Sequence, residues 1–455
     1  MALFDAASWA FVHPIGVHGR YFVDTVTREP FFVKGVDYQP GGSSAVTEDS
    51  DPLSDPNACA RDIIMFQELG INTIRVYSIN PDLNHDICMT MLASAGIYLV
   101  LDVNSPLEGQ HLNRYEPWLT YNEDYVEHVF KVIEQFSGYN NTLGFFAGNE
   151  IVNDKKSARN SPVYVKALIS DMKSYISKHS PRFIPVGYSA ADDLNYRVSL
   201  SKYLECTTGS LYDSVDFYGV NTYQWCGEQT FYTSGYDILV NDYEDYVRPV
   251  FFSEFGCNKV TPRLFEEVGS MFSNDMIGVF SGGLVYEYSQ EPNNYGLVEI
   301  DANGNLKLLK DYDHLKLQFN SVDLPTGREI ADLYTSHGKG LKLGAQAIPE
   351  CYDEYDNLDI NKGVDSAVSL LLLRNGVDAR RGKFVKLLEE DFFTTFNITT
   401  SSGAPFPTNY MKATHLPSTG VENNTNNVRN FKTRSSEIKY MDKAHLCHNN
   451  WVRFH

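Results

Sequence analysis

Two glutamates close two of the most apolar stretches of this 455-residue sequence. Glu150 ends "LGFFAGNE" (residues 143–150), and Glu254 lies in "PVFFSEFG" (residues 249–256). A carboxylate that follows a buried strand is costly to desolvate unless it has a partner. Enzymes that cleave glycosides use two carboxyl groups that face one glycosidic bond. At a separation of about 5–5.5 Å, one acts as the nucleophile and the other as the acid and then the base.

Alternatives remain open for these residues. Each glutamate could pair with an arginine, such as Arg75, at a structural rim. Asn149 could bond a sugar 2-hydroxyl, a contact that strengthens in the transition state, or it could simply close its strand. Asp102 could be a third acid of the same cleft or the partner of Arg75.

Eight strand-like runs in the first 290 residues must position these groups. They are rich in Val, Ile, Phe and Tyr and are nearly continuous, which is typical of parallel strands buried on both faces. Helical patterns lie between them, for example at residues 55–70, 122–139 and 161–179. This alternation predicts a (β/α)8 barrel. The runs span residues 31–39, 73–79, 98–103, 143–150, 184–190, 215–223, 249–256 and 283–289.

Polar side chains gather where these runs end, and in such a barrel that end carries the working residues. Carboxylates, amides and tyrosines together are typical of a carbohydrate cleft, because tyrosine offers an apolar face with a polar tip. The chain contains 29 Tyr, which suits such a surface. The residues at the strand ends include Asp37, Tyr38, Gln39, Arg75, Tyr77, Asp102, Asn104, Asn149, Glu150, Asn221, Thr222, Tyr223, Glu254, Tyr286 and Tyr288.

Composition excludes several classes of protein. A formal net charge of −20 argues against nucleic acid and against an anionic membrane surface. No run of 18 apolar residues predicts a membrane-spanning helix. We expect no metal and no cofactor, because the histidines do not cluster and no Gly-rich phosphate loop or Gly-x-Ser-x-Gly elbow is present. The first residues lack the pattern of a signal peptide.

The seven cysteines indicate an oxidising compartment. They form no Cys-x-x-Cys pair, and six of them with one left over fit three disulfides, for which 15 connectivities are open. Sequons at Asn140, Asn397 and Asn423 are compatible with a secreted glycoprotein.

The domain boundaries follow from where the strand and helix pattern weakens. We expect a catalytic barrel at residues 1–350 and an extension packed on it at residues 351–407. Within the extension, residues 363–378 form a helix or a strand, and residues 387–407 could add one or two strands. The composition of residues 408–455 predicts a poorly ordered polar tail.

The motifs resemble those of the fungal β-1,3-glucanosyltransferases of glycoside hydrolase family 72. The match runs through most of residues 15–350. It implies a (β/α)8 barrel and a retaining mechanism that cleaves an internal β-1,3 bond and joins the new reducing end to another glucan chain. The motifs that carry it are "VKGVDYQPGG", "INTIRVYSINP", "LGFFAGNE", "IPVGYSAADD", "YGVNTYQWCG", "PVFFSEFGCN" and "NNYGLVEID".

The resemblance also implies roles for individual residues. Glu150 in "GNE" looks like the acid/base, and Glu254 in "SEFG" looks like the nucleophile. The positions that match the family's glucan subsites are Gln39, Tyr77, Asp102, Asn149, Tyr223, Tyr286 and Tyr295. The implied disulfides are Cys59–Cys88, Cys206–Cys351 and Cys226–Cys257, which leaves Cys447 unpaired.

The implied partners are donor and acceptor chains of β-1,3-glucan, at the cell surface or in the cell wall. One cysteine after Cys351 is too few for the Cys-rich carbohydrate-binding module that some members carry. The membrane is expected as a partner only through a lipid anchor, whose signal this chain does not show. Two other functions stay open: an endo-β-1,3-glucanase with the same glutamates, and a non-catalytic glucan-binding protein.

Overall fold

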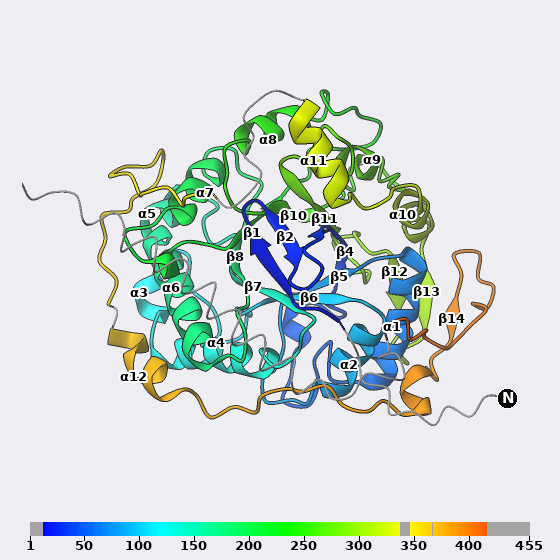
Figure 1. Ribbon diagram of the computed structural model, residues 1–455. Helices are drawn as coiled ribbons and strands as arrows, with labels where there is room; N and C mark the ends of the chain where they lie inside the picture. The colour runs from blue at the N-terminus through cyan, green and yellow to red at the C-terminus, as the bar shows by residue number, and fades with distance from the viewer. Residues whose placement is uncertain (1–11, 337–345, 366, 416–455) are drawn as a thin grey trace, which may run out of the picture.

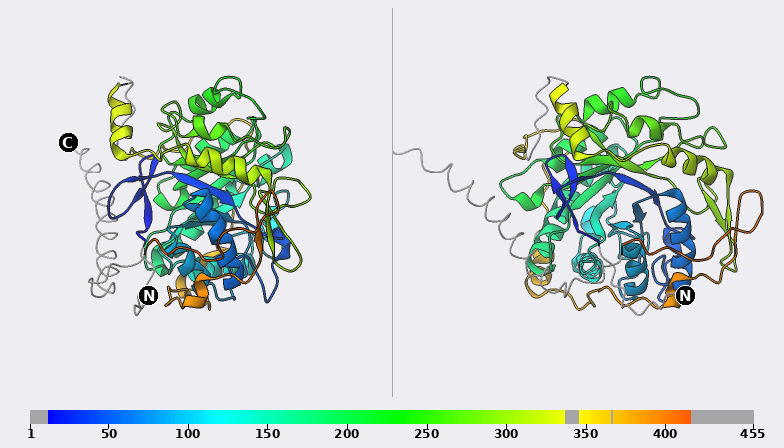
Figure 2. Two further views of the ribbon diagram at one scale, coloured as in Figure 1. Left: turned by 90° about the vertical axis from the view of Figure 1, so that its right-hand side faces the viewer. Right: turned by 45° about the vertical axis from the view of Figure 1, so that its right-hand side comes forward.

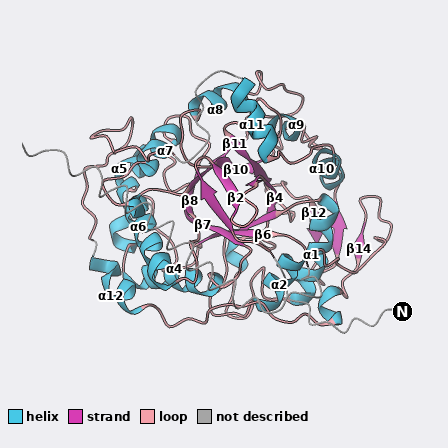
Figure 3. Cartoon of the chain, viewed as in Figure 1, coloured by secondary structure: helices cyan, strands magenta, loops and turns pink. Residues whose placement is uncertain are grey.

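Eight parallel strands close into a barrel at the centre of the molecule, and helices surround it (Figures 1 and 3). The computed structural model describes residues 12–336, 346–365 and 367–415. The strands are hydrogen-bonded in the order β10-β11-β4-β5-β6-β7-β8-β9, which confirms the predicted (β/α)8 barrel. They are β4 (Val33–Asp37), β5 (Thr73–Val76), β6 (Tyr98–Asp102), β7 (Thr142–Asn149), β8 (Val186–Ala190), β9 (Phe217–Asn221), β10 (Val250–Phe255) and β11 (Phe280–Val285).

The helices begin and end at residues suited to those positions. In the first long helix, α1, Asp55 caps the N-terminus by accepting from Asn57 N–H, and Gly70 ends it in the left-handed conformation. Asn122 caps α4 by accepting from Tyr125 N–H. The helices are α1 (Pro56–Leu69), α2 (Asp86–Ser94), α3 (Pro117–Thr120), α4 (Glu123–Phe136), α5 (Lys155–Asn160), α6 (Pro162–His179), α7 (Arg197–Glu205), α8 (Tyr236–Asp242), α9 (Glu267–Met271), α10 (Lys310–Asn320), α11 (Gly327–Ser336) and α12 (Ala367–Asn375), with short 3-10 turns η1 (Ser43–Ala45), η2 (Leu211–Asp213) and η3 (Glu389–Phe392).

A small antiparallel sheet covers the N-terminal end of the barrel and lies in front of it in Figure 1. It consists of β1 (Ile15–His18), β2 (Tyr21–Asp24) and β3 (Pro30–Phe31). Phe22 packs against Phe217 and Phe251, whose ring centroids lie 5.5 and 5.8 Å away. Aromatic rings fill this end of the barrel. The polar residues that end the strands therefore lie at the opposite, C-terminal end.

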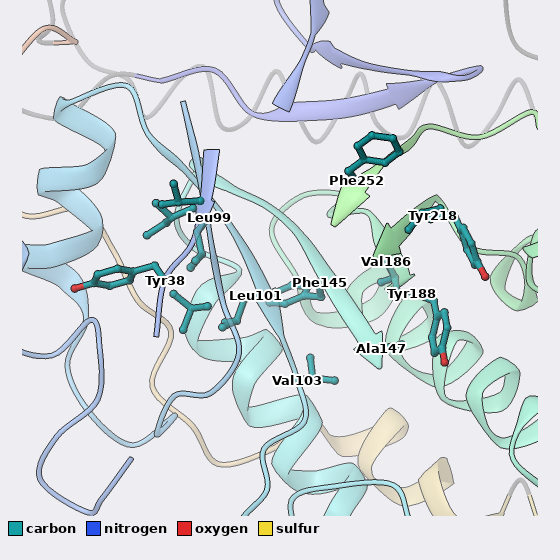
Figure 4. Close-up of a cluster of buried hydrophobic side chains, with 14 of the residues drawn as sticks. Tyr38, Leu99, Leu101, Val103, Phe145, Ala147, Val186, Tyr188, Tyr218 and Phe252 are labelled. Atoms are coloured by element: carbon teal, nitrogen blue, oxygen red, sulfur yellow. The ribbon is translucent and has the colours of Figure 1, made fainter. Parts of the chain in front are cut away.

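The main apolar core lies between the strands and the helices. Every second side chain of a strand points outward, away from the barrel interior and toward the helices. These outward side chains form the core and include Leu99, Leu101, Phe145 and Val186 (Figure 4). Burying large aliphatic and aromatic side chains on this face contributes roughly 1.5–3 kcal/mol each. The core therefore fixes the strand ends that carry the polar residues.

The C-terminal extension wraps around the outside of the barrel, runs below α4 and α2 in Figure 1, and reaches β14 (Figures 1 and 2). Asp359 N–H donates to Ala158 O of α5, and Arg381 pairs with Glu134 of α4 at 2.5 Å. The extension then adds β14 (Ile398–Thr399) to the hairpin of β12 (Val298–Ile300) and β13 (Leu306–Leu308).

The packed segment continues past residue 407, where composition predicts the tail to begin. Lys412 N–H donates to Gln67 Oε1 of α1, and Thr414 N–H donates to Ser94 O of α2. These contacts use backbone donors and neighbouring helix ends, which composition does not reveal. Residues 416–455, including Asn423 and Cys447, lie outside the described residues.

Three disulfides cross-link the described chain: Cys59–Cys88, Cys206–Cys351 and Cys226–Cys257. These are the pairs that the family resemblance implies. Cys206–Cys351 joins the end of α7 to the start of the extension across 145 positions of sequence.

Removing Cys206–Cys351 with a Cys206→Ala/Cys351→Ala variant should lower the free energy of unfolding by about 3–5 kcal/mol, because the bond closes a long loop in the unfolded chain. Denaturant unfolding of this variant can be compared with that of Cys59→Ala/Cys88→Ala, whose bond spans only 29 positions. We expect the shorter loop to contribute about 1 kcal/mol less. A smaller loss for Cys206–Cys351 than for Cys59–Cys88 would contradict this.

Candidate active site

Glu254 lies near the end of β10, buried, with hydrogen-bond donors on both carboxyl oxygens. Tyr77 O–H donates to Oε1 at 2.7 Å, and Tyr223 O–H donates to Oε2 at 2.6 Å. Arg75 Nη1 lies 3.3 Å from Oε1. Three donors hold one rotamer of this carboxylate and stabilise its charged form.

Arg75 fills the centre of the barrel directly behind Glu254. Its guanidinium donates two hydrogen bonds to Asp102, at 2.9 Å from Nε and 2.8 Å from Nη2. It lies over the rings of Phe146, 4.5 Å from the centroid, and Tyr77, at 4.3 Å. The two aromatic rings thus stabilise the buried guanidinium of Arg75, and this guanidinium in turn stabilises the carboxylate of Glu254.

Glu150 follows β7 immediately and is held by an amide from the neighbouring part of the barrel. Asn221 Nδ2 donates to Glu150 Oε1 at 2.8 Å and lies 3.2 Å from Asn149 Oδ1. No described residue donates to Glu150 Oε2 or accepts from Asn149 Nδ2. Glu150 has a φ of +50°, in the left-handed region, which is strained for a residue with a side chain. The backbone therefore turns sharply to present this carboxyl group.

Two serine hydroxyls connect the two glutamates across the barrel. Ser189 Oγ lies 2.8 Å from Asn149 Oδ1 and 2.9 Å from Ser253 Oγ. Ser253 Oγ in turn donates to Asn221 Oδ1 at 2.8 Å. Because Asn221 binds Glu150 and Ser253 precedes Glu254, this chain of hydrogen bonds fixes the two carboxyl groups relative to one another.

Burial raises the pKa of Glu254 to about 7, and the charge of Glu150 adds to this rise. Arg75 and the hydroxyls of Tyr223 and Tyr77 act in the opposite direction, because they stabilise the carboxylate. Burial and the charge of Glu150 thus oppose ionisation of Glu254, and its hydrogen-bond donors favour it.

Four half-buried tyrosine rings surround Glu254 at the barrel mouth. The Tyr286 ring lies edge-on to those of Tyr77, Tyr223 and Tyr295, with centroids 6.5, 6.3 and 5.3 Å apart. Tyr223 and Tyr295 also meet edge-on at 5.6 Å. Such a rim offers apolar ring surface and hydroxyl groups, the two features that recognise a pyranose.

Gln39 and Asp102 are buried and already have protein partners. The Gln39 amide accepts from the N–H groups of Tyr77 and Ser78 and donates to Ser78 O, which fixes the chain after β5. Asp102 is the bidentate partner of Arg75. The structure thus brings Gln39 and Asp102 to the predicted end of the barrel, but places these two behind the rim rather than on it. A contact of either with sugar stays a prediction.

Tyr38 and Tyr288, which the sequence also places at strand ends, do not face the cleft. Both are buried between the strands and α1, where their hydroxyls donate to Asp62.

The sequence places Asn221 at a strand end without giving it a role, and it does not single out Ser189 or Ser253. Asn221 ends its predicted strand, so the rule that favours strand ends is the signal that points to it. Ser189 and Ser253 lie within β8 and β10, and a small polar residue at an inward position of a strand is common without any function.

The family model for Glucanosyltransferase, Glyco_hydro_72, matches residues 5–323. The chain belongs to this family. The resemblance seen in the sequence motifs is thereby confirmed.

This glucanosyltransferase-family chain is 60% identical over 395 residues to 1,3-beta-glucanosyltransferase GAS4 of Saccharomyces cerevisiae, with 87% of this chain and 82% of that protein covered. It is 47% identical over 386 residues to 1,3-beta-glucanosyltransferase gel2 of Aspergillus fumigatus, with 85% and 80% covered. Among solved structures, a variant of Saccharomyces cerevisiae Gas2p in complex with laminaritetraose and laminaripentaose matches with a TM-score of 0.64 and 43% identity, covering 70% of this chain and 69% of that one.

Two further properties hold for the part of this family member that the structure describes. Within residues 12–336, 346–365 and 367–415, no group of three or more His, Cys, Asp or Glu side chains could hold a metal ion. The same residues contain no helix with the length and apolar character needed to cross a membrane.

The tyrosine hydroxyls on Glu254 lead to a pH-dependent prediction. In Tyr223→Phe the carboxylate loses a donor at 2.6 Å, so the pKa of Glu254 should rise. Activity that needs the carboxylate is lost as pH falls through this pKa, so the acid limb of kcat/KM should move to higher pH by roughly one unit. Tyr286→Phe is the matched control, because no hydrogen bond joins Tyr286 to Glu254. An acid limb that stays in place or moves to lower pH in Tyr223→Phe would refute this role.

Proposed function

We propose that this chain is a retaining 1,3-β-glucanosyltransferase that cleaves an internal bond of β-1,3-glucan and transfers the new reducing end to another glucan chain. The pairing of Glu150 and Glu254 across one barrel mouth, each held by fixed donors, is the observation that carries the proposal. The glucanosyltransferase activity after which the family and its relatives are named agrees with it.

Glu254 is assigned as the nucleophile. Its carboxylate attacks the anomeric carbon and forms a glycosyl ester, while the glycosidic oxygen leaves with a proton from Glu150. Arg75, Tyr77 and Tyr223 orient the attacking oxygens, since all three contact this carboxyl group.

Glu150 is assigned as the acid and then the base. Its Oε2 has no partner among the described residues, so this oxygen is available to the leaving group. In the second step, Glu150 takes the proton of the incoming hydroxyl, whose oxygen attacks the anomeric carbon of the ester and releases the carboxylate of Glu254. Two displacements at the same carbon give retention of the β configuration.

Asn149 and the tyrosine rim are assigned to sugar binding. Asn149 Nδ2 has no partner among the described residues, whereas its Oδ1 is fixed by Ser189 and Asn221, so the amide is oriented with a free donor. A donor beside the acid can bond the sugar 2-hydroxyl. The rings of Tyr77, Tyr223, Tyr286 and Tyr295 would line the subsites on either side.

Hydrolysis is the competing function, because water could attack the same ester. A laminari-oligosaccharide of one length, supplied as donor, and the same oligosaccharide with a reduced end, supplied as acceptor, separate the two outcomes. Transfer predicts products longer than either substrate that carry the reduced end, detected by mass. Only shorter products would establish an endo-β-1,3-glucanase, and no turnover would favour a non-catalytic glucan-binding protein.

We place this activity outside the cell, at the cell surface or in the cell wall. Three disulfides in the described chain suit an oxidising compartment. The substrate, a wall polysaccharide, would be met there.

The sequons differ in how much room they leave for a glycan. Asn397 is exposed directly before β14, whereas Asn140 is half-buried and the Thr142 hydroxyl of its sequon donates to Phe136 O. We expect Asn397 to carry an N-glycan in the secreted protein and Asn140 to be modified less. Peptide mass before and after glycan removal, with Asn397→Gln as control, tests this. Full occupancy of Asn140 with Asn397 bare would contradict it.

A further inference from the structure

Asp37 is a buried carboxyl group at the active site that the proposed chemistry does not use. It is the last residue of β4, its side chain is wholly buried, and neither carboxyl oxygen has a hydrogen-bond partner among the described residues. The strand register places it directly beside Arg75 on β5. Charged groups this deeply buried are normally paired and hydrogen-bonded.

Arg75 does not provide that pairing. Its Nε and Nη2 groups donate to Asp102, and its Nη1 group lies 3.3 Å from both Ser253 O and Glu254 Oε1. Every nitrogen of the guanidinium is thus directed at another acceptor. Asp37 therefore lies next to a cation without receiving a hydrogen bond from it.

The surroundings of Asp37 are dominated by acids. Burial raises the pKa of Asp37 well above its ordinary value, Arg75 opposes this, and the negative charges of Glu254, Asp102 and Glu287 add to the rise. The charged and titratable groups that act on Asp37, or on which it acts, are Arg75, Tyr77, Asp102, Tyr223, Glu254, Tyr286 and Glu287.

The donors are distributed unequally among the three carboxyl groups around Arg75. Asp102 accepts two N–H bonds, and Glu254 has two tyrosine hydroxyls and one N–H. Asp37 has none. With one guanidinium for three carboxyl groups, the group without donors is the one that keeps its proton, because ionising it would leave an uncompensated buried charge.

We propose that Asp37 is a positioning residue that acts as a neutral carboxylic acid beside Arg75. Its lack of charge leaves the guanidinium to Asp102 and Glu254, which lets Glu254 stay ionised. Ionisation of Asp37 at high pH would draw Arg75 from Glu254 and place a second negative charge beside the nucleophile. This inference rests on the proposed role of Glu254.

The test isolates the first chemical step from the acid function of Glu150. In a Glu150→Gln background with a laminari-oligosaccharyl fluoride as donor, the initial burst of fluoride reports attack by Glu254, because fluoride leaves without protonation and the second step lacks its base. We expect the rate to fall at high pH as Asp37 ionises. Adding Asp37→Asn should move this high-pH limb up by at least about one unit, with the acid limb shifted by less than about 0.3 of a unit. Asp37→Ser is a second neutral variant should Asp37→Asn not fold.

A direct readout accompanies the kinetics. The infrared difference spectrum between the full-length wild type and Asp37→Asn, recorded at the pH of maximal rate, should contain the carbonyl band of a protonated carboxylic acid. A carboxylate band instead, or an acid limb lowered by about one unit or more in Asp37→Asn, would show that Asp37 is charged and overturn the inference. Retained fluoride release by Glu254→Gln would instead overturn the proposed function, so the two failures are distinguishable.

Discussion

Replacing Glu254 with glutamine is expected to reduce the transfer rate by at least about a thousandfold, because the amide cannot form the glycosyl ester. The substitution keeps the shape of the side chain and its contacts with Tyr77 and Tyr223. Folding should survive, since a buried carboxyl group is replaced by a neutral group of the same size. The measurements are the rate of formation of elongated laminari-oligosaccharides and the melting temperature.

Glu205→Gln is the matched control for this variant. Glu205 is also buried, on α7, and burial raises its pKa to about 7, as it does for Glu254. Its Oε1 accepts from Val247 N–H at 2.6 Å, a bond that glutamine can keep. Equal losses of activity in the two variants would mean that a general effect on the fold, and not the nucleophile, explains the result.

Replacing Glu150 with glutamine should reduce turnover of natural glucan by a factor of about 10²–10⁴, because no acid then protonates the glycosidic oxygen. The same variant should still release fluoride from a laminari-oligosaccharyl fluoride, whose leaving group needs no proton. Glutamine keeps the contact with Asn221, so the backbone turn at this residue should persist.

Azide separates the two roles by stereochemistry. In Glu150→Ala, azide can attack the ester on Glu254 and give a glycosyl azide of β configuration, the outcome of two displacements. In Glu254→Ala, azide occupies the place of the carboxylate and attacks directly, which gives the α configuration. Exchanged configurations in the two variants would reverse the assignment of acid/base and nucleophile.

The architecture could be predicted from the sequence because eight continuous apolar runs alternate with helical patterns. The predicted run at residues 143–150 became β7 (Thr142–Asn149), and the run at 249–256 became β10 (Val250–Phe255). Both glutamates could be located by the same rule, since each ends or nearly ends its run. Side-chain contacts between strands could not be predicted in this way, because they depend on register and rotamer.

The roles of Ser189, Ser253 and Asp37 also depend on strand register and side-chain rotamer, which the sequence does not reveal. Ser189 and Ser253 matter only because β8 and β10 bring their hydroxyls within 2.9 Å of one another. The isolation of Asp37 follows from the geometry of Arg75, whose donors are taken by residues from two other strands. Asp102 could be either a cleft residue or the partner of Arg75 from the sequence alone, and the structure shows the pairing.

The most direct test of the central claim is to identify the residue that carries the sugar during the reaction. The Glu150→Gln variant, mixed with a laminari-oligosaccharyl fluoride without acceptor and quenched in acid, should accumulate the glycosyl-enzyme. After proteolysis, the peptide that contains Glu254 should gain the mass of the oligosaccharide, and adding azide before the quench should remove this mass, because azide attacks without a general base. Sugar on a different residue, or a product of inverted configuration with no covalent adduct, would contradict the account.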